Sequence, residues 1–328
     1  MTQCFVGFDT SNYTTSAAIC LSSGEVVANI KLPLPVAEGQ RGLRQSDAVF
    51  SHVRNLPTVC ARLGEYISDG GYEPIAVGVS VRPRDADGSY MPCFLSGRAA
   101  AASFAANGAL PLYEFSHQNG HVMAAAYSSG RMDSLISSPF LAFHVSGGTT
   151  EALYVTPNGS SFDIELIGET DDINAGQAID RVGVAMGLRF PCGAELERLA
   201  AAYTERKGKI RKHPVTVRNA RCSLSGAENI ALGIYRETGD REAAAAFVFD
   251  FICRTLIAMT EQAMERVGTL PVLYAGGVMS NRLMRDALSE RFDASFADGA
   301  FSADNAAGIA LLTAREHMAR KGAEGIRI

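Results

Sequence analysis

The sequence predicts an α/β protein built from two similar lobes, and three observations indicate this. The chain has 328 residues, which is long enough for two packed domains. A segment near the N-terminus, residues 5–17, is repeated near the middle of the chain, in residues 140–152. Each copy is followed by alternating strand and helix patterns, the order typical of an α/β sheet.

The repeat consists of an apolar strand, a Ser/Gly/Thr turn and a second strand. Six matches could arise by chance between two short apolar segments. The same offset, however, also relates a Ser-Gly pair to an Asn-Gly pair, and both suit hairpin turns. We therefore interpret the repeat as a duplication. The matching pairs are Phe5 and Phe140, Phe8 and Phe143, Ser11 and Ser146, Thr14 and Thr149, Thr15 and Thr150, Ala17 and Ala152, and Gly24 and Gly159.

The remaining patterns complete each lobe. We expect strands at 75–81, 111–115 and 272–275, and helices at 94–106, 173–188, 243–266 and 305–320. The expected first lobe is 1–115 and the second is 116–304, with the closing helix 305–320 returning to the first lobe. Two such lobes facing each other would form a cleft, where ligands usually bind.

Composition narrows the class of protein. The formal net charge is −5, so any contact with RNA must be local or shared with a partner. The seven cysteines lack metal-type spacing and are expected to be reduced thiols. The chain shows no secretory signal pattern and no apolar run of 18 residues, which predicts a cytoplasmic protein.

The two Ser/Gly/Thr turns are candidate phosphate sites. Backbone N–H groups in a tight turn form a concave anion site, and hydroxyl groups add donors. The second turn, residues 146–149, is the stronger candidate because Gly147 and Gly148 permit close approach to the backbone. Ser11 occupies the same position in the first turn. An ordinary hairpin turn is the alternative for each.

His117 and His121 are candidate metal ligands. Residues four apart share a helix face, and Ser116 precedes them as a helix cap. Gln118 stands where a zinc peptidase has its catalytic Glu, so the pair indicates a metal site but not a protease. Asp304, before the closing helix, is a candidate third ligand. The alternative is a pair of surface histidines.

Further candidate ligand residues lie in the second half. Asp180 falls within an amphipathic helix, and its carboxylate could bind the hydroxyls of a ribose. Asp171 and Asp172 stand at the start of the helix, where negative charge is favourable without any function. A buried strand ending in Gly276 and Gly277 would let a flat ligand lie against the backbone. Asn281 can both donate to and accept from a purine edge.

Together and in this order, these segments resemble the tRNA threonylcarbamoyladenosine transferase family, the TsaD proteins, once known as O-sialoglycoprotein endopeptidases. The resemblance runs from Phe5 to about Ala314. It implies the two-lobed actin-like ATPase fold of the sugar kinase–Hsp70–actin superfamily. The motifs that carry it are His117 with His121, Ser146-Gly147-Gly148, residues 168–180, Gly276-Gly277-Val278 with Asn281, and Asp304-Asn305-Ala306-Ala307.

The resemblance also implies residue roles. The metal, iron or zinc, would be held by His117, His121 and Asp304. Residues 146–149 would meet the phosphate or acyl end of an acyl-adenylate. The ribose would contact Asp180, Gly193 and Glu197, and the adenine would contact Asn281. The family transfers threonylcarbamoyl from its adenylate to N6 of a tRNA adenosine, and in bacteria it works with a degenerate paralogue and an ATPase.

The chain departs from the family pattern near the expected reacting group. An acidic pair in the family's first loop is replaced by Tyr13 and Thr14. The His of Gly-Gly-His-Thr is replaced by Thr149, and the Lys of Ser-Gly-Leu-Lys-Thr by Glu228. The metal and nucleoside positions are retained, which indicates a divergent paralogue.

Three functions stay open from the sequence. The first is the transferase, and the second is a nucleotide- and metal-binding regulator or scaffold that has lost turnover. The third is a small-molecule phosphotransferase, in which Asp9 at the end of the first strand would hold Mg²⁺-nucleotide. The His pair argues against the third, since kinases prefer oxygen ligands for their metals. A basic run at 206–212 is a candidate tRNA phosphate contact shared with a partner, and a solvated loop is its alternative.

Overall fold

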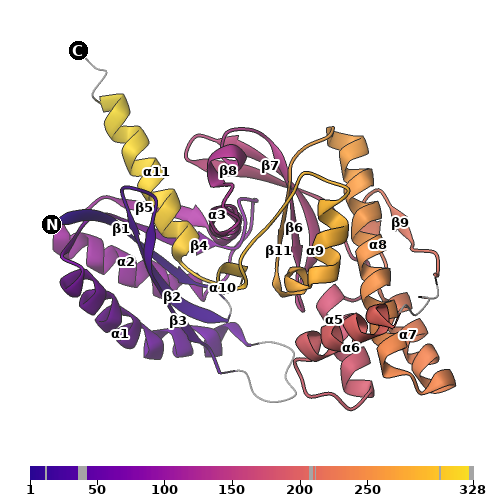
Figure 1. Ribbon diagram of the computed structural model, residues 1–328. Coiled ribbons are helices and arrows are strands. Elements are labelled where there is room, and N and C mark those ends of the chain that lie inside the picture. The colour runs from indigo at the N-terminus through magenta and orange to yellow at the C-terminus, as the bar shows by residue number, and fades with distance from the viewer. Residues whose placement is uncertain (12, 36–42, 207–209, 211, 303, 325–328) are drawn as a thin grey trace. The chain divides into compact units, whose positions relative to one another are not determined.

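The computed structural model describes residues 1–11, 13–35, 43–206, 210, 212–302 and 304–324. The chain folds as two compact units (Figure 1). The first unit contains Met1–Met132, Pro157–Asp163 and the chain from Ala300 onward. The second contains Asp133–Thr156 and Ile164–Gly299.

The first unit is built on a five-stranded sheet in the order β3-β2-β1-β4-β5. β1, β2 and β3 are antiparallel neighbours, whereas β4 and β5 run parallel to β1. The strands are β1 (Thr2–Thr10), β2 (Thr14–Leu21), β3 (Val26–Pro33), β4 (Tyr72–Arg82) and β5 (Leu112–Ser116).

Helices cover both faces of this sheet, and alternate residues of β1 show which helices lie on each. Phe8 stacks edge-on against Phe104 of α2 (Phe94–Gly108), and the Thr10 hydroxyl accepts a hydrogen bond from the Gly97 amide of the same helix. Asp9 points to the other face, toward α3 (His117–Ser128). Successive side chains of an extended strand point to opposite faces, so Asp9 points toward α3, which carries His117 and His121.

The helices α3 and α11 (Ala307–Glu324) cross very closely. A Cβ added at Gly308 would lie 1.8 Å from the carbonyl oxygen of Gly120, so glycine is required at this crossing. Because α3 packs on α11, the first unit continues past residue 115, where we expected the lobe to end, to Met132. The closing helix itself lies in the first unit.

The second unit is built on a sheet in the order β12-β11-β6-β7-β8. β6 is antiparallel to β7 and parallel to β11, which is in turn parallel to β12. The strands are β6 (Phe140–Val145), β7 (Thr150–Asn158), β8 (Ser161–Glu169), β11 (Val272–Ala275) and β12 (Ala294–Phe296).

The two sheets repeat each other strand for strand, which confirms the duplication. Each has a three-stranded antiparallel run whose first strand also pairs with a parallel strand, and that strand pairs in turn with a second parallel strand. The register is conserved as well, because Phe8 pairs with Ala17 and Phe143 with Ala152. Gly24 and Gly159 both have positive φ, as the hairpin turns require.

The core of the second unit forms around the long helix α8 (Arg241–Val267). This helix is long and apolar enough to cross a membrane by length and composition, yet most of its apolar stretch is buried inside the protein. Its buried residues pack with β6, α5 (Ala175–Ala185) and α7 (Ser225–Thr238), as expected for a central core helix. The Thr260 hydroxyl is hydrogen bonded to the hydroxyl of Tyr274, which lies on β11.

The expected helices and strands form close to their predicted positions. The helix expected at 173–188 is shorter, because Gly187, with positive φ, ends it. The long helix α1 was not predicted, since Pro57 interrupts its middle and only four of its side chains are buried. The remaining elements are α1 (Gln45–Asp69), α4 (Met132–Leu135), α5 (Ala175–Ala185), α6 (Gly193–Glu205), β9 (Val217–Arg218), β10 (Arg221–Cys222), α7 (Ser225–Thr238), η1 (Gly277–Ser280), α9 (Arg282–Ser289) and α10 (Gly299–Ser302).

Candidate metal centre and nucleotide pocket

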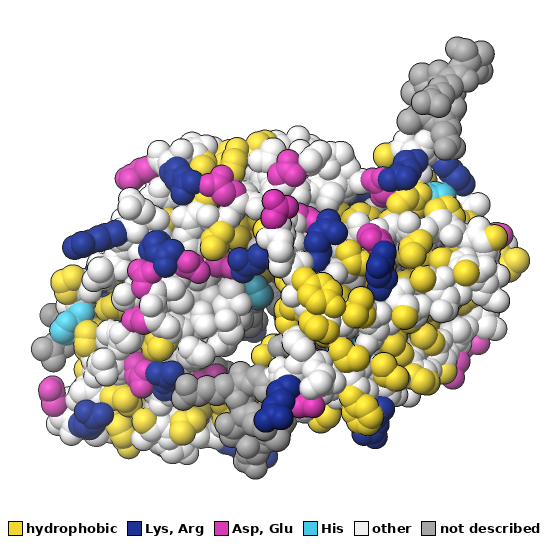
Figure 2. Space-filling view, turned by 180° about the vertical axis from the view of Figure 1, so that it is seen from behind, with side chains coloured by type: hydrophobic (Ala, Val, Ile, Leu, Met, Phe, Trp, Pro, Cys, Tyr) yellow, Lys and Arg dark blue, Asp and Glu magenta, His cyan; other side chains and the backbone are white. Residues whose placement is uncertain are grey.

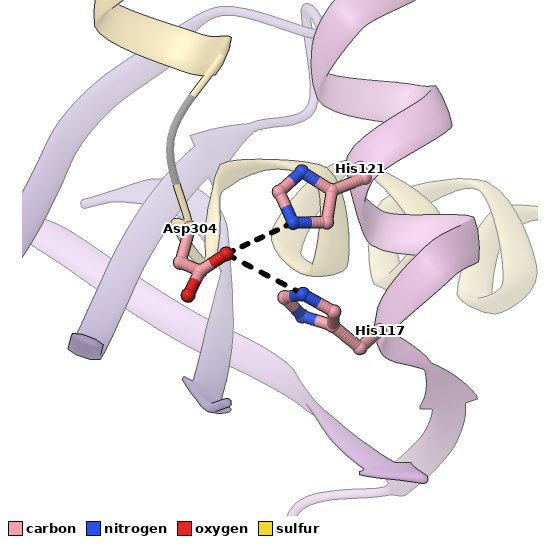
Figure 3. A group of neighbouring side chains, drawn as sticks. All are labelled: His117, His121 and Asp304. Atoms are coloured by element: carbon pink, nitrogen blue, oxygen red, sulfur yellow. Dashed lines mark hydrogen bonds and ion pairs between the residues drawn. The ribbon is translucent and has the colours of Figure 1, made fainter. Parts of the chain in front are cut away.

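His117, His121 and Asp304 converge in the first unit (Figure 3). Both histidines project from α3 toward Asp304, which lies just before α11. The Nε2 atoms of His117 and His121 lie 3.5 Å and 3.1 Å from Oδ1 of Asp304. One ligand atom from each residue falls within 4.8 Å of the others. The structure therefore brings the three predicted ligands together across 183 residues of sequence.

Local hydrogen bonds fix the start of the histidine helix. The Ser116 hydroxyl caps α3 by accepting a hydrogen bond from the Asn119 amide. It also donates to Asp85, whose carboxylate accepts a second hydrogen bond from the Asn119 side chain at 2.5 Å. The amide of Gln118 donates to the Pro83 carbonyl. The loop after β4 thus holds the first turn of α3, so both imidazoles are positioned by backbone that is itself anchored.

Asp9 supports the cluster from the sheet. It is fully buried, and its Oδ1 lies 2.9 Å from Nδ1 of His117 and also accepts a hydrogen bond from Ser80. Burial alone would raise the pKa of Asp9, but the adjacent His117 imidazole lowers it below its ordinary value. A carboxylate on Nδ1 leaves Nε2 of His117 directed at Asp304. From the sequence, Asp9 was expected to hold a Mg²⁺-nucleotide, and no local pattern connects it to His117.

The remaining charges reinforce this arrangement. Burial would lower the pKa of His117, but the carboxylates of Asp9 and Asp304 outweigh that effect and raise it to about 10. Burial would likewise raise the pKa of Asp304, yet hydrogen bonds from His117 and His121 hold it far below its usual range. Two carboxylates therefore face the imidazoles, and the negative charge favours a cation.

The donor set fits a transition metal. Two imidazoles and one carboxylate are ligands that iron(II) and zinc accept, and they leave further coordination positions open. The His117–Asp9 hydrogen bond is the outer-sphere contact that usually orients a metal-binding histidine. His117, His121 and Asp304 would hold the ion, and Asp9 would keep His117 in the required tautomer.

Substitution of Asp9 by Asn is expected to weaken metal binding by about 10- to 100-fold, as loss of an outer-sphere carboxylate commonly does. Asn keeps the size of the side chain, but its oxygen is a weaker acceptor for Nδ1 of His117. The measurement is competition with a chromogenic chelator. Ser80→Ala, which removes the other partner of Oδ1, serves as the control, and an equal loss in both variants would indicate general damage to the site.

The second unit contains a cavity of about 370 Å³ that is suited to a nucleoside. Five of the predicted ligand residues line it, namely Gly147, Asp180, Gly193, Glu197 and Asn281, and Gly277 is a sixth. Apolar walls come from Ile179, Phe249 and Val278. The structure thus brings together side chains from α5, α6 and the start of α9, with backbone from the turn after β6.

Polar groups in this cavity have defined roles. Asn281 caps α9, because its Oδ1 accepts from the Met284 amide, while its buried Nδ2 has no partner among the described residues. A ligand atom that accepts a hydrogen bond, such as a purine ring nitrogen, would satisfy Nδ2. Asp180 accepts from the Cys192 amide, and burial raises its pKa. Glu197 accepts from the Arg282 amide.

The turn at 146–149 is closed by its own hydroxyl group. The Ser146 Oγ accepts hydrogen bonds from the amides of Gly148 and Thr149, at 3.2 Å and 3.1 Å. Gly147 and Gly148 are exposed, and a Cβ at either would meet open space. For these amides to bind a phosphate, the Ser146 side chain must rotate away.

The acidic stretch before α5 is structural. The Asp172 carboxylate accepts from the amides of Leu224 and Ser225 and so caps α7. Asp171 and Glu169 both pair with Arg221. The charge of Asp172 therefore stabilises the start of α7, which is distant in sequence, and the sequence alone could not reveal this contact.

Ser11, the departures from the family pattern and the basic run occupy varied positions. Ser11 is buried at the end of β1, and its hydroxyl has no partner among the described residues. Tyr13 is 44% exposed, and Thr14 begins β2. Glu228, on α7, pairs with Arg181 of α5 at 3.1 Å. Most of the basic run 206–212 lies outside the described residues, and Arg206 within it pairs with Asp240 and Glu242.

A family model identifies the relatives of this chain. The model of TsaD, tRNA N6-adenosine threonylcarbamoyltransferase, matches residues 51–311. The chain belongs to the TsaD family. A TsaD protein of Streptococcus pneumoniae (strain Taiwan19F-14) is 29% identical over 297 residues, covering 87% of this chain and 82% of that protein. One from Streptococcus thermophilus (strain CNRZ 1066) is 29% identical over 320 residues, covering 92% and 88%.

Solved structures outside the TsaD family share the fold. Full-length HypF in its phosphate- and nucleotide-bound form superposes with a TM-score of 0.57 at 13% identity, covering 96% of this chain and 46% of that one. The activator of 2-hydroxyisocaproyl-CoA dehydratase from Clostridium difficile gives 0.52 at 14% identity, covering 99% and 98%. This likeness confirms the actin-like ATPase fold predicted for this TsaD-family chain.

Proposed function

We propose that this TsaD-family protein transfers threonylcarbamoyl from its adenylate to N6 of an adenosine in tRNA. The observation that carries the proposal is the convergence of His117, His121 and Asp304, with Asp9 behind them. A chance pair of surface histidines would have neither a third ligand nor a buried carboxylate on the far ring nitrogen. The family membership supplies the reaction and the substrates.

The cavity of the second unit would hold the adenylate. The carboxylates of Asp180 and Glu197 would accept hydrogen bonds from the ribose hydroxyls. The unpartnered Nδ2 of Asn281 would donate to the adenine, and Gly277 and Gly193 would let the ligand lie against backbone. The amides of the 146–149 turn would receive the phosphate or acyl oxygen once Ser146 rotates.

In the reaction, the N6 amine of adenosine attacks the threonylcarbamoyl carbonyl and forms the new C–N bond. The bond to the phosphate oxygen breaks, AMP leaves with the electron pair, and the amine loses one proton to solvent. A metal held by His117, His121 and Asp304 would supply Lewis-acid polarisation of the acyl group. The turn amides of Gly148 and Thr149 would stabilise negative charge that develops on oxygen. Asp9 would keep His117 in the tautomer that presents Nε2.

A regulator or scaffold that has lost turnover is the second candidate. The observations that favour it are Tyr13 and Thr14 in place of the acidic pair, and Glu228 in place of the lysine, where it is neutralised by Arg181. The third candidate, a phosphotransferase with Asp9 as the Mg²⁺ ligand, gains no support, because Asp9 is fully buried and bonded to Ser80 and His117.

Three measurements on the purified protein test the proposal. Elemental analysis should find about one iron or zinc ion per chain. A thermal-shift panel should show stabilisation by AMP and by a stable acyl-adenylate analogue. Transfer of labelled threonylcarbamoyl to tRNA should be measured with and without candidate partners, a degenerate paralogue and an ATPase. Metal and adenylate binding without transfer under any of these conditions would favour the regulator.

Restoring the acidic pair, Tyr13→Asp with Thr14→Glu, is expected to raise the transfer rate, on the order of 10²-fold if the carboxylates position a reacting group. The gain should require the metal, because carboxylates without a cation would repel the phosphate. The assay is transfer of labelled threonylcarbamoyl before and after chelation. Tyr13→Asn with Thr14→Gln is the matched uncharged control, and an equal gain there would mean that charge is not the cause.

By the same family resemblance, we propose that the protein works in the cytoplasm. The membrane-length helix α8 is accounted for as a core helix of the second unit.

A further inference from the structure

The segment that follows α5 runs back along that helix and forms a lip of the nucleotide cavity. The Leu188 amide donates to the Gly183 carbonyl, and the Cys192 amide donates to Asp180 on the cavity wall. The side chain of Cys192 packs so closely on Gly183 that an added Cβ would lie 2.3 Å away. Residues between these anchors are therefore held beside the cavity, and Pro191 lines it.

An aromatic side chain projects from this lip into solvent. Phe190 is 69% exposed, the highest value among the described aromatic residues. Within the described part of the chain, no ring or cation stacks on it. Arg189 beside it is exposed, and so is Val184 on the adjoining helix. An exposed phenylalanine ring would gain burial energy by contacting a flat apolar ligand.

The other strongly exposed phenylalanine differs in this respect. Phe50 on α1 is 62% exposed, but the guanidinium of Arg54 lies 5.7 Å from its ring centre. Its ring face is thus already occupied in part. Phe190 combines a free ring face, a neighbouring arginine and a position on the lip of a nucleoside-sized cavity.

We propose that Phe190 is a stacking platform for an unpaired base of the RNA acceptor, with Arg189 contacting its phosphate. Single-stranded nucleotides are recognised by aromatic side chains on which bases stack, together with arginine. A contact of this kind needs few basic residues, so it is compatible with the net negative charge of the chain. On the face shown in Figure 2, the basic and acidic side chains of the described residues are interspersed and form no broad basic surface. The inference rests on the proposed function, which supplies the RNA acceptor.

The test compares Phe190→Ala, Phe190→Trp and wild type in the full-length protein. The probe is an RNA hairpin with adenosine in its unpaired loop, and a fully paired RNA duplex and AMP are the two reference ligands. Phe190→Ala should lose about 5- to 100-fold in affinity for the hairpin, the usual effect of removing a stacked aromatic. Phe190→Trp should retain binding, and AMP affinity should stay the same in all forms. Phe50→Ala, which removes the other strongly exposed phenylalanine, is the matched control and should bind the hairpin like wild type.

The outcomes separate this inference from the proposed function. Unchanged hairpin affinity in Phe190→Ala, with transfer to tRNA intact, would overturn the stacking role and leave the transferase standing. Equal losses for hairpin and AMP would mean that the lip had collapsed rather than lost a contact, and would also overturn it. Wild-type protein that binds AMP but no RNA would refute the inference together with the proposed acceptor, and would point to a protein partner for Phe190.

Discussion

Replacement of both His117 and His121 by Ala is expected to strip the metal from the purified protein. The two imidazoles supply two of the three converging ligand atoms, and Asp304 alone would hold a divalent ion only weakly. Ala is the best helix former, so α3 should persist. Transfer to tRNA should fall to background, while AMP should still bind, since its cavity lies in the other unit.

The measurements are elemental analysis after dialysis and calorimetric titration with zinc and iron(II). Gln118→Ala, one residue along the same helix, is the matched control and should retain full metal content. Retention of metal in the double variant would contradict the assignment of all three ligands. Loss of metal from the control as well would show that α3, rather than its histidines, had been damaged.

Substitution of Gly308 by Ala is expected to destabilise the protein by about 2–3 kcal/mol, in the upper range for overpacking a closely packed contact. The added methyl group would lie 1.8 Å from the carbonyl oxygen of Gly120, so α3 and α11 must move apart. Because the histidines come from α3 and Asp304 precedes α11, this movement separates the ligands. Metal affinity should therefore fall together with stability.

Urea unfolding and metal titration check both effects. Gly322→Ala, on the same helix α11, is the control, since no atom of the described residues beyond its own helix backbone and chain neighbours lies within 4 Å of the added methyl group. It should be neutral or stabilising by up to about 1 kcal/mol, the usual gain of Ala over Gly in a helix. A Gly308→Ala protein with normal stability would show that the two helices do not pack as closely as the structure indicates.

Elements whose signals are local could be predicted from the sequence alone. The repeat of residues 5–17 in 140–152 predicted both hairpins, and even their register follows, because pairing across a tight turn depends on nearby residues. The spacing of His117 and His121 placed two imidazoles on one helix face for the same reason. The motifs, taken in order, indicated the family.

The meeting of distant segments, by contrast, depends on how the whole chain packs. Asp304 reaches the histidines because α11 crosses α3 at Gly120 and Gly308, a contact that depends on the absence of two side chains. Asp172 likewise caps α7, a helix that begins some fifty residues further along the chain. No periodicity or spacing encodes such meetings, because they result from packing whole helices and sheets together. The position of Asp9 behind His117 was decided in the same way, by the face of β1 that α3 covers.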